Sequence, residues 1–213
     1  MILPIKTMPA VIAFLALSAT ASAAADPPKA EDASAVAQYQ QLHLTKDPSA
    51  ALAGTYKLDP HHASVIAKLA HMDLSRYTLR FNEIAGSFNF DPSTATATHL
   101  DFTINPASVD TGDAAFDKRI ADKYFEAPVY PAIHFTADSV KIVGDHASVQ
   151  GILEFHGVKK PVMLQAVYRG FAQSRIGFSG EASFKRSQFG VGQWVPLEAD
   201  DVTILVEMEF IRQ

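Results

Sequence analysis

The 213-residue sequence contains no cysteine. Thiol catalysis, disulfides and thiolate metal sites are therefore excluded. A basic face is lacking too, because the formal net charge is −5 and the lysines and arginines are scattered. We accordingly expect no nucleic-acid partner, since polyanion binding requires clustered positive charge. No apolar run reaches the roughly 20 residues of a membrane-spanning helix, so we expect a chain that is not membrane-spanning.

Metal-binding spacings are also scarce. Three of the eight histidines, His61, His62 and His71, fall in the stretch DPHHASVIAKLAHM. Side chains of adjacent residues on a strand point to opposite faces, which separates His61 from His62. His62 and His71 are nine residues apart, or roughly 30 Å along a strand at about 3.3 Å per residue. Neither HxH nor HExxH occurs, and we predict no metal site.

Catalytic signatures are equally sparse. The nearest approach to a nucleophile elbow is GFSGE at residues 177–181, which lacks the final glycine and lies in a strand-like pattern. The glycines fall singly, so neither a phosphate-binding loop nor a dinucleotide fingerprint is formed. The sequence predicts no catalytic residue and no cofactor, and we expect a protein that is not an enzyme.

The N-terminus has the pattern of a signal peptide. Lys6 precedes a short apolar run, Met8 to Leu17, and Ala21-Ser22-Ala23 has the small-x-small form of a cleavage site. We predict a signal peptide over residues 1–23, cleaved after Ala23 or Ala25, and export to the periplasm, where a sizeable core can dispense with disulfides.

Residues 24–53 are rich in alanine, proline, aspartate and lysine. We interpret them as a linker with a short helix over Ala33 to Leu44. A packed N-terminal helix that closes one end of the domain is the alternative, because Val36, Tyr39 and Leu42 are spaced to form an apolar face.

From residue 54 onward the apolar residues recur with a period of two, which is typical of half-buried strands. Short turns between them favour antiparallel neighbours. Residues 54–213 are therefore predicted to form one mainly β domain, an extended antiparallel barrel of about eight strands, with a short helical insert near 110–128. The expected strands are 63–72, 76–90, 100–105, 132–143, 147–156, 161–169, 178–185 and 202–210, with a short one at 54–58.

The inward faces of these strands carry many phenylalanines, among 14 in the chain. A packed core is the simplest interpretation of each one. Together with small residues on the same faces, at Gly86, Ala137, Gly151, Gly180 and Ala182, they favour an apolar cavity. About ten methylenes entering it, at roughly 0.8 kcal/mol each, suffice for micromolar binding before ordering costs. The candidate ligand-binding residues are His71, Leu69, Ala67, Phe88, Phe90, Phe102, Phe125, Phe135, Phe155, Phe178 and Phe184.

Several short motifs follow one another along the chain: DPHHAS at 59–64, RFNE at 80–83, ASVDTG at 107–112, HGVKKPV at 156–162 and RSQFGV at 186–191. In this order they resemble the YceI-like family of polyisoprenoid-binding proteins, and the resemblance covers residues 54–213. It implies a lipocalin-like, usually exported barrel that encloses a long isoprenoid or other acyl chain and is not known chiefly as an enzyme.

The resulting hypothesis is a carrier for a polyisoprenoid, an isoprenoid quinone or a fatty-acyl amide, with a phosphate head least favoured. His71, inward by alternation, contacts either the head group or a neighbouring core residue. One alternative is an enzyme that modifies a lipid head group, with His71 or His62 as general base and Asp59, Glu83 or Asp117 as its partner. Another is an interaction module whose barrel is filled by its own side chains. Homodimer formation is left open.

Overall fold

The computed structural model describes residues 30–213, so the predicted signal peptide and its cleavage points lie outside the described residues. The chain divides into two compact units, residues 1–39 and 40–213. Helix α1 (Ala30–Gln41) falls where the sequence predicts a short helix. Over the described range, no helix has both the length and the apolar character needed to cross a bilayer.

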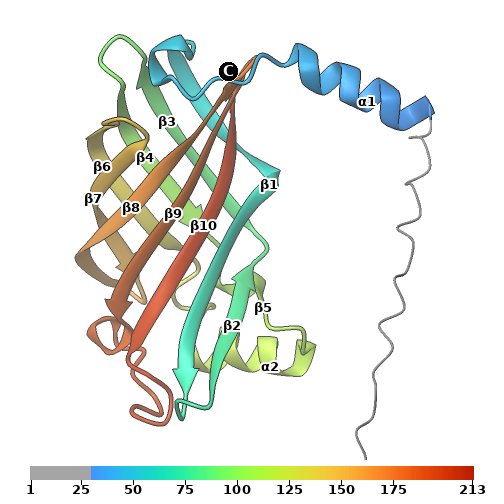
Figure 1. Cartoon of the computed structure of the whole chain (residues 1–213). Helices are drawn as coiled ribbons and strands as arrows, with labels where there is room; N and C mark the ends of the chain where they lie inside the picture. The colour runs from blue at the N-terminus through green and yellow to red at the C-terminus, as the bar shows by residue number, and fades with distance from the viewer. Residues whose placement is uncertain (1–29) are drawn as a thin grey trace, which may run out of the picture. The chain divides into compact units, whose positions relative to one another are not determined.

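The second unit is a closed antiparallel barrel, which confirms the predicted fold class (Figure 1). The wall strands pair in the order β1-β3-β4-β6-β7-β8-β9-β10, and β1 pairs with β10 to close the wall. Alternating burial along each strand places one face toward the interior. The wall consists of β1 (Gly54–His71), β3 (Ile84–Asp91), β4 (Thr96–Ile104), β6 (Ile133–Lys141), β7 (His146–Phe155), β8 (Val158–Ala172), β9 (Arg175–Lys185) and β10 (Asp201–Arg212).

The strand predicted over residues 76–90 is two strands, β2 (Ser75–Phe81) and β3. Both pair with β1, which bends at a bulge between Leu58 and Ala63. The break falls at Asn82 and Glu83, whose backbone N–H groups both donate to Ser108 Oγ, at 3.2 and 3.0 Å. The serine thus replaces ladder partners at the corner, which a period-two pattern alone does not reveal.

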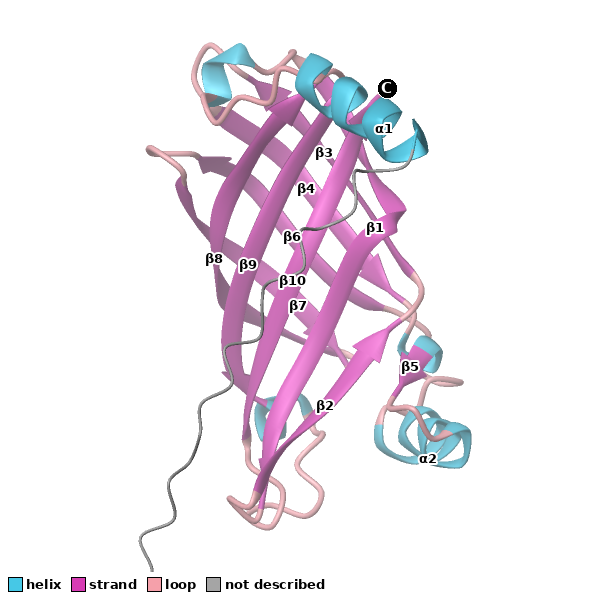
Figure 2. Cartoon of the chain, turned by 45° about the vertical axis from the view of Figure 1, so that its right-hand side comes forward, coloured by secondary structure: helices cyan, strands magenta, loops and turns pink. Residues whose placement is uncertain are grey.

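The predicted helical insert is present as α2 (Ala114–Arg119) and a π-helical turn, η3 (Ile120–Tyr124). Asp113 caps α2 by accepting hydrogen bonds from the N–H groups of Ala115 and Phe116. A short strand, β5 (Val109–Asp110), pairs with β2 and brings the insert beside it (Figure 2). Two further 3-10 turns, η2 (Pro106–Ser108) and η4 (Arg186–Phe189), lie at strand ends.

The last part of the segment predicted as a linker is attached to the barrel. Thr45 exchanges two backbone hydrogen bonds with Phe171, at 3.0 and 2.8 Å. After the turn η1 (Pro48–Ala50), Ala51 is buried and Leu52 accepts a hydrogen bond from the Tyr56 hydroxyl at 2.8 Å. Residues 45–53 therefore pack against the end of the barrel where β1 begins.

Candidate functional site

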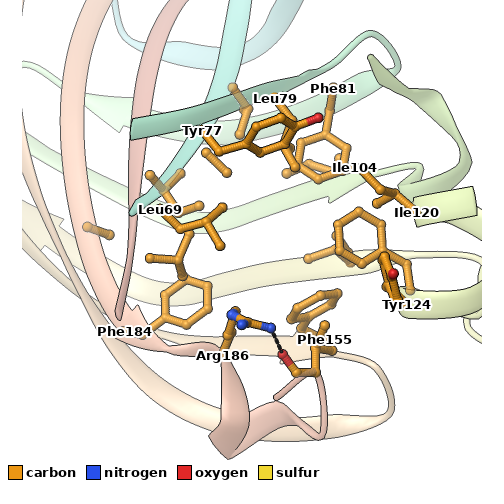
Figure 3. A pocket seen from close by; sticks show the side chains of 18 of the residues that line it. Leu69, Tyr77, Leu79, Phe81, Ile104, Ile120, Tyr124, Phe155, Phe184 and Arg186 are labelled. Atoms are coloured by element: carbon orange, nitrogen blue, oxygen red, sulfur yellow. Dashed lines mark hydrogen bonds between the residues drawn. The ribbon is translucent and has the colours of Figure 1, made fainter. Parts of the chain in front are cut away.

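The opposite half of the barrel contains a cavity of about 690 Å³. It opens where β1 turns into β2 and where the connection from β9 to β10 passes, and its wall is mainly apolar (Figure 3). A volume of this size lies within the range of small-molecule sites. The predicted binding residues that line it are Ala67, Leu69, His71, Phe102, Phe125, Phe135, Phe155 and Phe184.

Three predicted binding residues, Phe88, Phe90 and Phe178, do not line the cavity. They belong to the packed cluster that fills the far half of the barrel. The Phe88 ring lies 4.9 Å from that of Phe210 and 5.9 Å from that of Phe178, at edge-to-face angles that close-packed aromatic rings favour. Alternation correctly assigned these rings to the interior, but it carries no information about position along the barrel axis.

Gly86 and Gly151, which we expected to leave cavity space, are instead covered by aromatic rings. A Cβ atom on Gly86 would lie 2.3 Å from Cδ1 of Phe102, and one on Gly151 would lie 2.3 Å from Cζ of Phe135. The two rings therefore occupy the space that the glycines provide. Both rings line the cavity and pack on the far cluster, so they form its floor.

Strand β2 contributes a wall that the sequence interpretation missed. Tyr77, Leu79 and Phe81 all line the cavity, and Tyr77 pairs with Leu69 of β1 (Figure 3). The signal was available, because these three residues alternate with polar Thr78 and with Arg80 in the sequence.

The insert supplies the wall next to β2. Phe116, Ile120, Tyr124 and Phe125 line the cavity, and the Phe116 ring lies 5.8 Å from that of Tyr77. Buried Ile120 anchors this segment in the core. The insert is thus part of the side wall beside the opening.

Polar groups are few and lie near the opening. The Tyr77 hydroxyl is buried and makes no hydrogen bond of good geometry among the described residues, and burial raises the pKa of this phenol, a rise that the neighbouring Thr111 side chain reduces. His71 lies at the rim, where its side chain is 42% exposed and its Nε2 is 3.7 Å from Glu198 Oε1. His71 is therefore inward, as predicted, but it lies at the entrance and has an acidic neighbour.

Arg186 also lines the cavity, yet four of its five N–H donors are already used. Its guanidinium donates four hydrogen bonds, at 2.7 to 3.1 Å, to backbone carbonyls of the β9–β10 connection. Burial lowers its pKa. The residue thereby fixes the connection that forms one side of the opening, and it leaves no free donor fork for an anionic ligand.

His61 and His62 lie in the β1 bulge and do not line the cavity. His62 Nδ1 is 2.9 Å from Asp59 Oδ2, and Arg175 Nη1 donates to Asp59 at 2.6 Å and to Glu209 at 3.0 Å. Asp59, His62 and Glu209 offer atoms within 4.8 Å of one another. A cation there would compete with the Arg175 charge that already bridges both carboxylates.

Comparisons with known proteins agree with this geometry. The profile of the YceI-like domain matches residues 56–210. A UPF0312 protein of Pseudomonas paraeruginosa is 34% identical over 171 residues, which cover 76% of this chain and 90% of the relative. The solved structure of BcnA from Burkholderia cenocepacia has a TM-score of 0.65 at 26% identity, over 71% of this chain and 98% of that one.

A more distant structure has the same fold. It is a polyisoprenoid-binding domain from Saccharophagus degradans, implicated in plant cell wall breakdown. Its TM-score is 0.61 at 17% identity, over 74% of this chain and 98% of that domain. At this identity the likeness concerns the fold alone.

Proposed function

The chain belongs to the YceI-like family, and on that premise we propose that it is an exported periplasmic protein that binds and carries a long apolar chain inside its barrel. The observation that carries the proposal is the apolar cavity of about 690 Å³, closed by the rings of Phe102 and Phe135 and open at the other end. Each methylene withdrawn from water there contributes about 0.8 kcal/mol.

A polyisoprenoid or isoprenoid quinone is the proposed cargo, in keeping with the polyisoprenoid-binding name of the Saccharophagus domain. A fatty-acyl amide is the second choice. The tail would point to the floor and the head to the opening, where the His71 imidazole and, after a rotamer change that exposes it, the Tyr77 hydroxyl can hydrogen-bond a carbonyl or hydroxyl. Arg186 is the one lysine or arginine among the described lining residues, and four of its five N–H donors are committed, so a neutral head is favoured.

Binding without turnover is part of the same proposal. Of the two histidines considered as a general base, only His71 lines the cavity. Asp59, Glu83 and Asp117 do not line it, and each is hydrogen-bonded elsewhere. Turnover of a candidate lipid that disappears in His71→Phe would favour the enzyme instead.

The proposal is tested by filling the cavity from a position that faces it. Ala182 lines the cavity on β9, whereas its neighbour Ser183 is exposed on the outer face. Ala182→Phe should abolish binding of a polyprenol measured by titration, and Ser183→Phe should retain it. Equal binding of polyprenol by both variants would mean that the polyprenol binds outside the barrel.

The head-group assignment has its own test. Tyr77→Phe removes one hydroxyl from the wall and keeps the ring. It should weaken binding of a polyprenyl quinone or alcohol more than binding of the plain hydrocarbon. His71→Phe, which removes a polar group at the rim, should have the same selective effect. Equal losses for polar-headed and plain chains would contradict a polar contact at these residues.

A further inference from the structure

An apolar rim borders one side of the opening of the cavity. It consists of Met72 and Leu74, at the tip of the β1–β2 hairpin, and Trp194, Val195 and Leu197 in the β9–β10 connection. Their exposed fractions are 50, 81, 63, 41 and 53%, respectively. The two segments are joined by a hydrogen bond from Met72 N to Leu197 O at 2.8 Å, and they lie together at the lower end of the barrel in Figures 1 and 2.

The rim is continuous with the cavity. Trp194 and Leu197 both line the cavity and expose much of their surface to solvent. The apolar surface therefore runs from the interior onto the outside without a polar boundary at these two residues. Contiguous exposed apolar surface of this kind marks an interaction site.

The backbone does not explain why the rim residues are apolar. The hairpin turn has positive φ at both central residues, 48° at Met72 and 56° at Asp73, and Leu74 N donates to His71 O at 3.0 Å. Such a turn favours Asn-Gly, and a bulky side chain such as methionine is disfavoured in it. Trp194 is likewise at φ 66°. Large apolar side chains thus occupy positions where backbone preference opposes them.

The charge pattern indicates the partner. Among residues 72–74 and 193–198 the charged residues are Asp73 and Glu198, both acidic, and the chain as a whole has a net charge of −5. A surface with so little charge loses little solvation on entering an apolar phase, and it offers no attraction to anionic lipid. Tryptophan is also the residue most typical of the membrane–water interface.

We propose that this rim docks the open end of the barrel onto a lipid bilayer, inserting Leu74 and Trp194 among the acyl chains so that cargo passes between membrane and cavity without crossing water. The transfer of cargo in this proposal rests on the proposed carrier function. The docking itself depends only on the rim residues. It is driven by apolar burial rather than by charge, as for interfacial amphipathic segments.

Trp194 is the single tryptophan of the chain and reports on docking directly. Vesicles of zwitterionic phosphatidylcholine should shift its emission to the blue, and brominated acyl chains should quench it. Binding measured by co-sedimentation should persist at high salt, because screening weakens only charge-driven association. Emission unchanged by vesicles, or binding that salt abolishes, would overturn the proposal.

Three variants locate the docking surface. Leu74→Ser should weaken vesicle binding about tenfold or more, the factor expected when one leucine no longer enters an apolar phase. Met72→Asn with Asp73→Gly should also weaken it while maintaining or raising thermal stability, since the new pair suits the turn. Val143→Ser, 71% exposed in the hairpin at the far end, is the matched control and should bind as the parent does.

Two other outcomes would overturn docking. If the rim is covered by a second copy of this chain, size-exclusion chromatography will show a dimer that Leu74→Ser dissociates, and vesicles will not bind. If vesicles bind equally to all three variants, another surface is responsible. Polyprenol binding is measured alongside, because it separates the two proposals. If polyprenol binds and vesicles do not, the docking is overturned and the carrier function stands. If vesicles bind and polyprenol does not, the carrier function is overturned and the docking stands.

Discussion

The phenyl ring of Phe135 covers Gly151 so closely that a Cβ atom on the glycine would lie 2.3 Å from Cζ of the ring. This contact holds the ring across the barrel, between the packed cluster and the cavity. Phe102 makes the equivalent contact over Gly86. The depth of the cavity is therefore set by two glycine–aromatic pairs, a known way of pinning register and side-chain position in sheets.

Gly151→Ala should destabilise the barrel by about 1–3 kcal/mol, because the ring must move in a close-packed interior. Urea unfolding measures the change. Gly177→Ala on β9 is the matched control, since its Cβ would meet only Arg169 Cβ at 3.5 Å, an ordinary contact. A loss of stability as large in the control would show that the ring contact is not the cause.

Phe135→Ala should deepen the cavity and move the preference toward longer prenyl chains, as judged by affinities for chains of increasing length. Loss of the ring also costs about 3–5 kcal/mol of stability. Phe178→Ala controls for that loss, because Phe178 lies in the packed cluster and does not line the cavity. If Phe135→Ala leaves the chain-length preference unchanged, Phe135 does not form the floor of the cavity.

Arg186→Lys should loosen the β9–β10 connection, because lysine cannot reproduce four guanidinium hydrogen bonds to carbonyls. A loss of about 2–4 kcal/mol is expected from the bonds removed. Hydrogen exchange should accelerate in residues 190–199. Lys185→Ala, which removes an exposed ion pair with Asp201, should cost less stability than Arg186→Lys does. Unchanged exchange in Arg186→Lys would show that the connection is held by other contacts.

The β1 bulge should be sensitive to acid. Arg175 and His62 hold the pKa of Asp59 well below its usual range. Because the folded-state pKa is lower than the unfolded one, ionised Asp59 stabilises the fold above the unfolded value of about 4, and the contribution is lost as the pH falls. Asp59→Asn should therefore lower the free energy of unfolding at pH 7, and its difference from the parent should shrink toward pH 3.

Exposed Asp138 on β6 provides the matched variant for that measurement, as Asp138→Asn. It should change the free energy of unfolding at pH 7 far less than Asp59→Asn does. A constant difference between Asp59→Asn and the parent from pH 7 to pH 3 would mean that the carboxylate charge is not what stabilises the bulge.

Much of the barrel could be predicted because its strands are buried on one face, so that the period of two identifies the inward side chains. The same period gives no information on position along the barrel axis. For that reason it predicts Phe88 and Phe178 as ligand-binding residues together with Phe155. The floor could not be foreseen either, because Gly151 and Phe135 meet across neighbouring strands rather than along the sequence.

The entrance was the least predictable part. His71 is inward by alternation, but the strand ends there, so the residue lies at the rim beside Glu198, which no pattern connects to it. Arg186 was part of a recognised motif, yet its role depends on carbonyls of the folded connection. Tyr77 could have been found, because the period of two continues through β2.

The most direct test of the carrier function is the identity of what the barrel holds. The protein would be purified from its native host without detergent, extracted with organic solvent and examined by mass spectrometry. We predict a long-chain isoprenoid or acyl lipid with a neutral head, which Ala182→Phe fails to retain. A protein that yields no lipid and also refuses added polyprenyl chains would contradict the account.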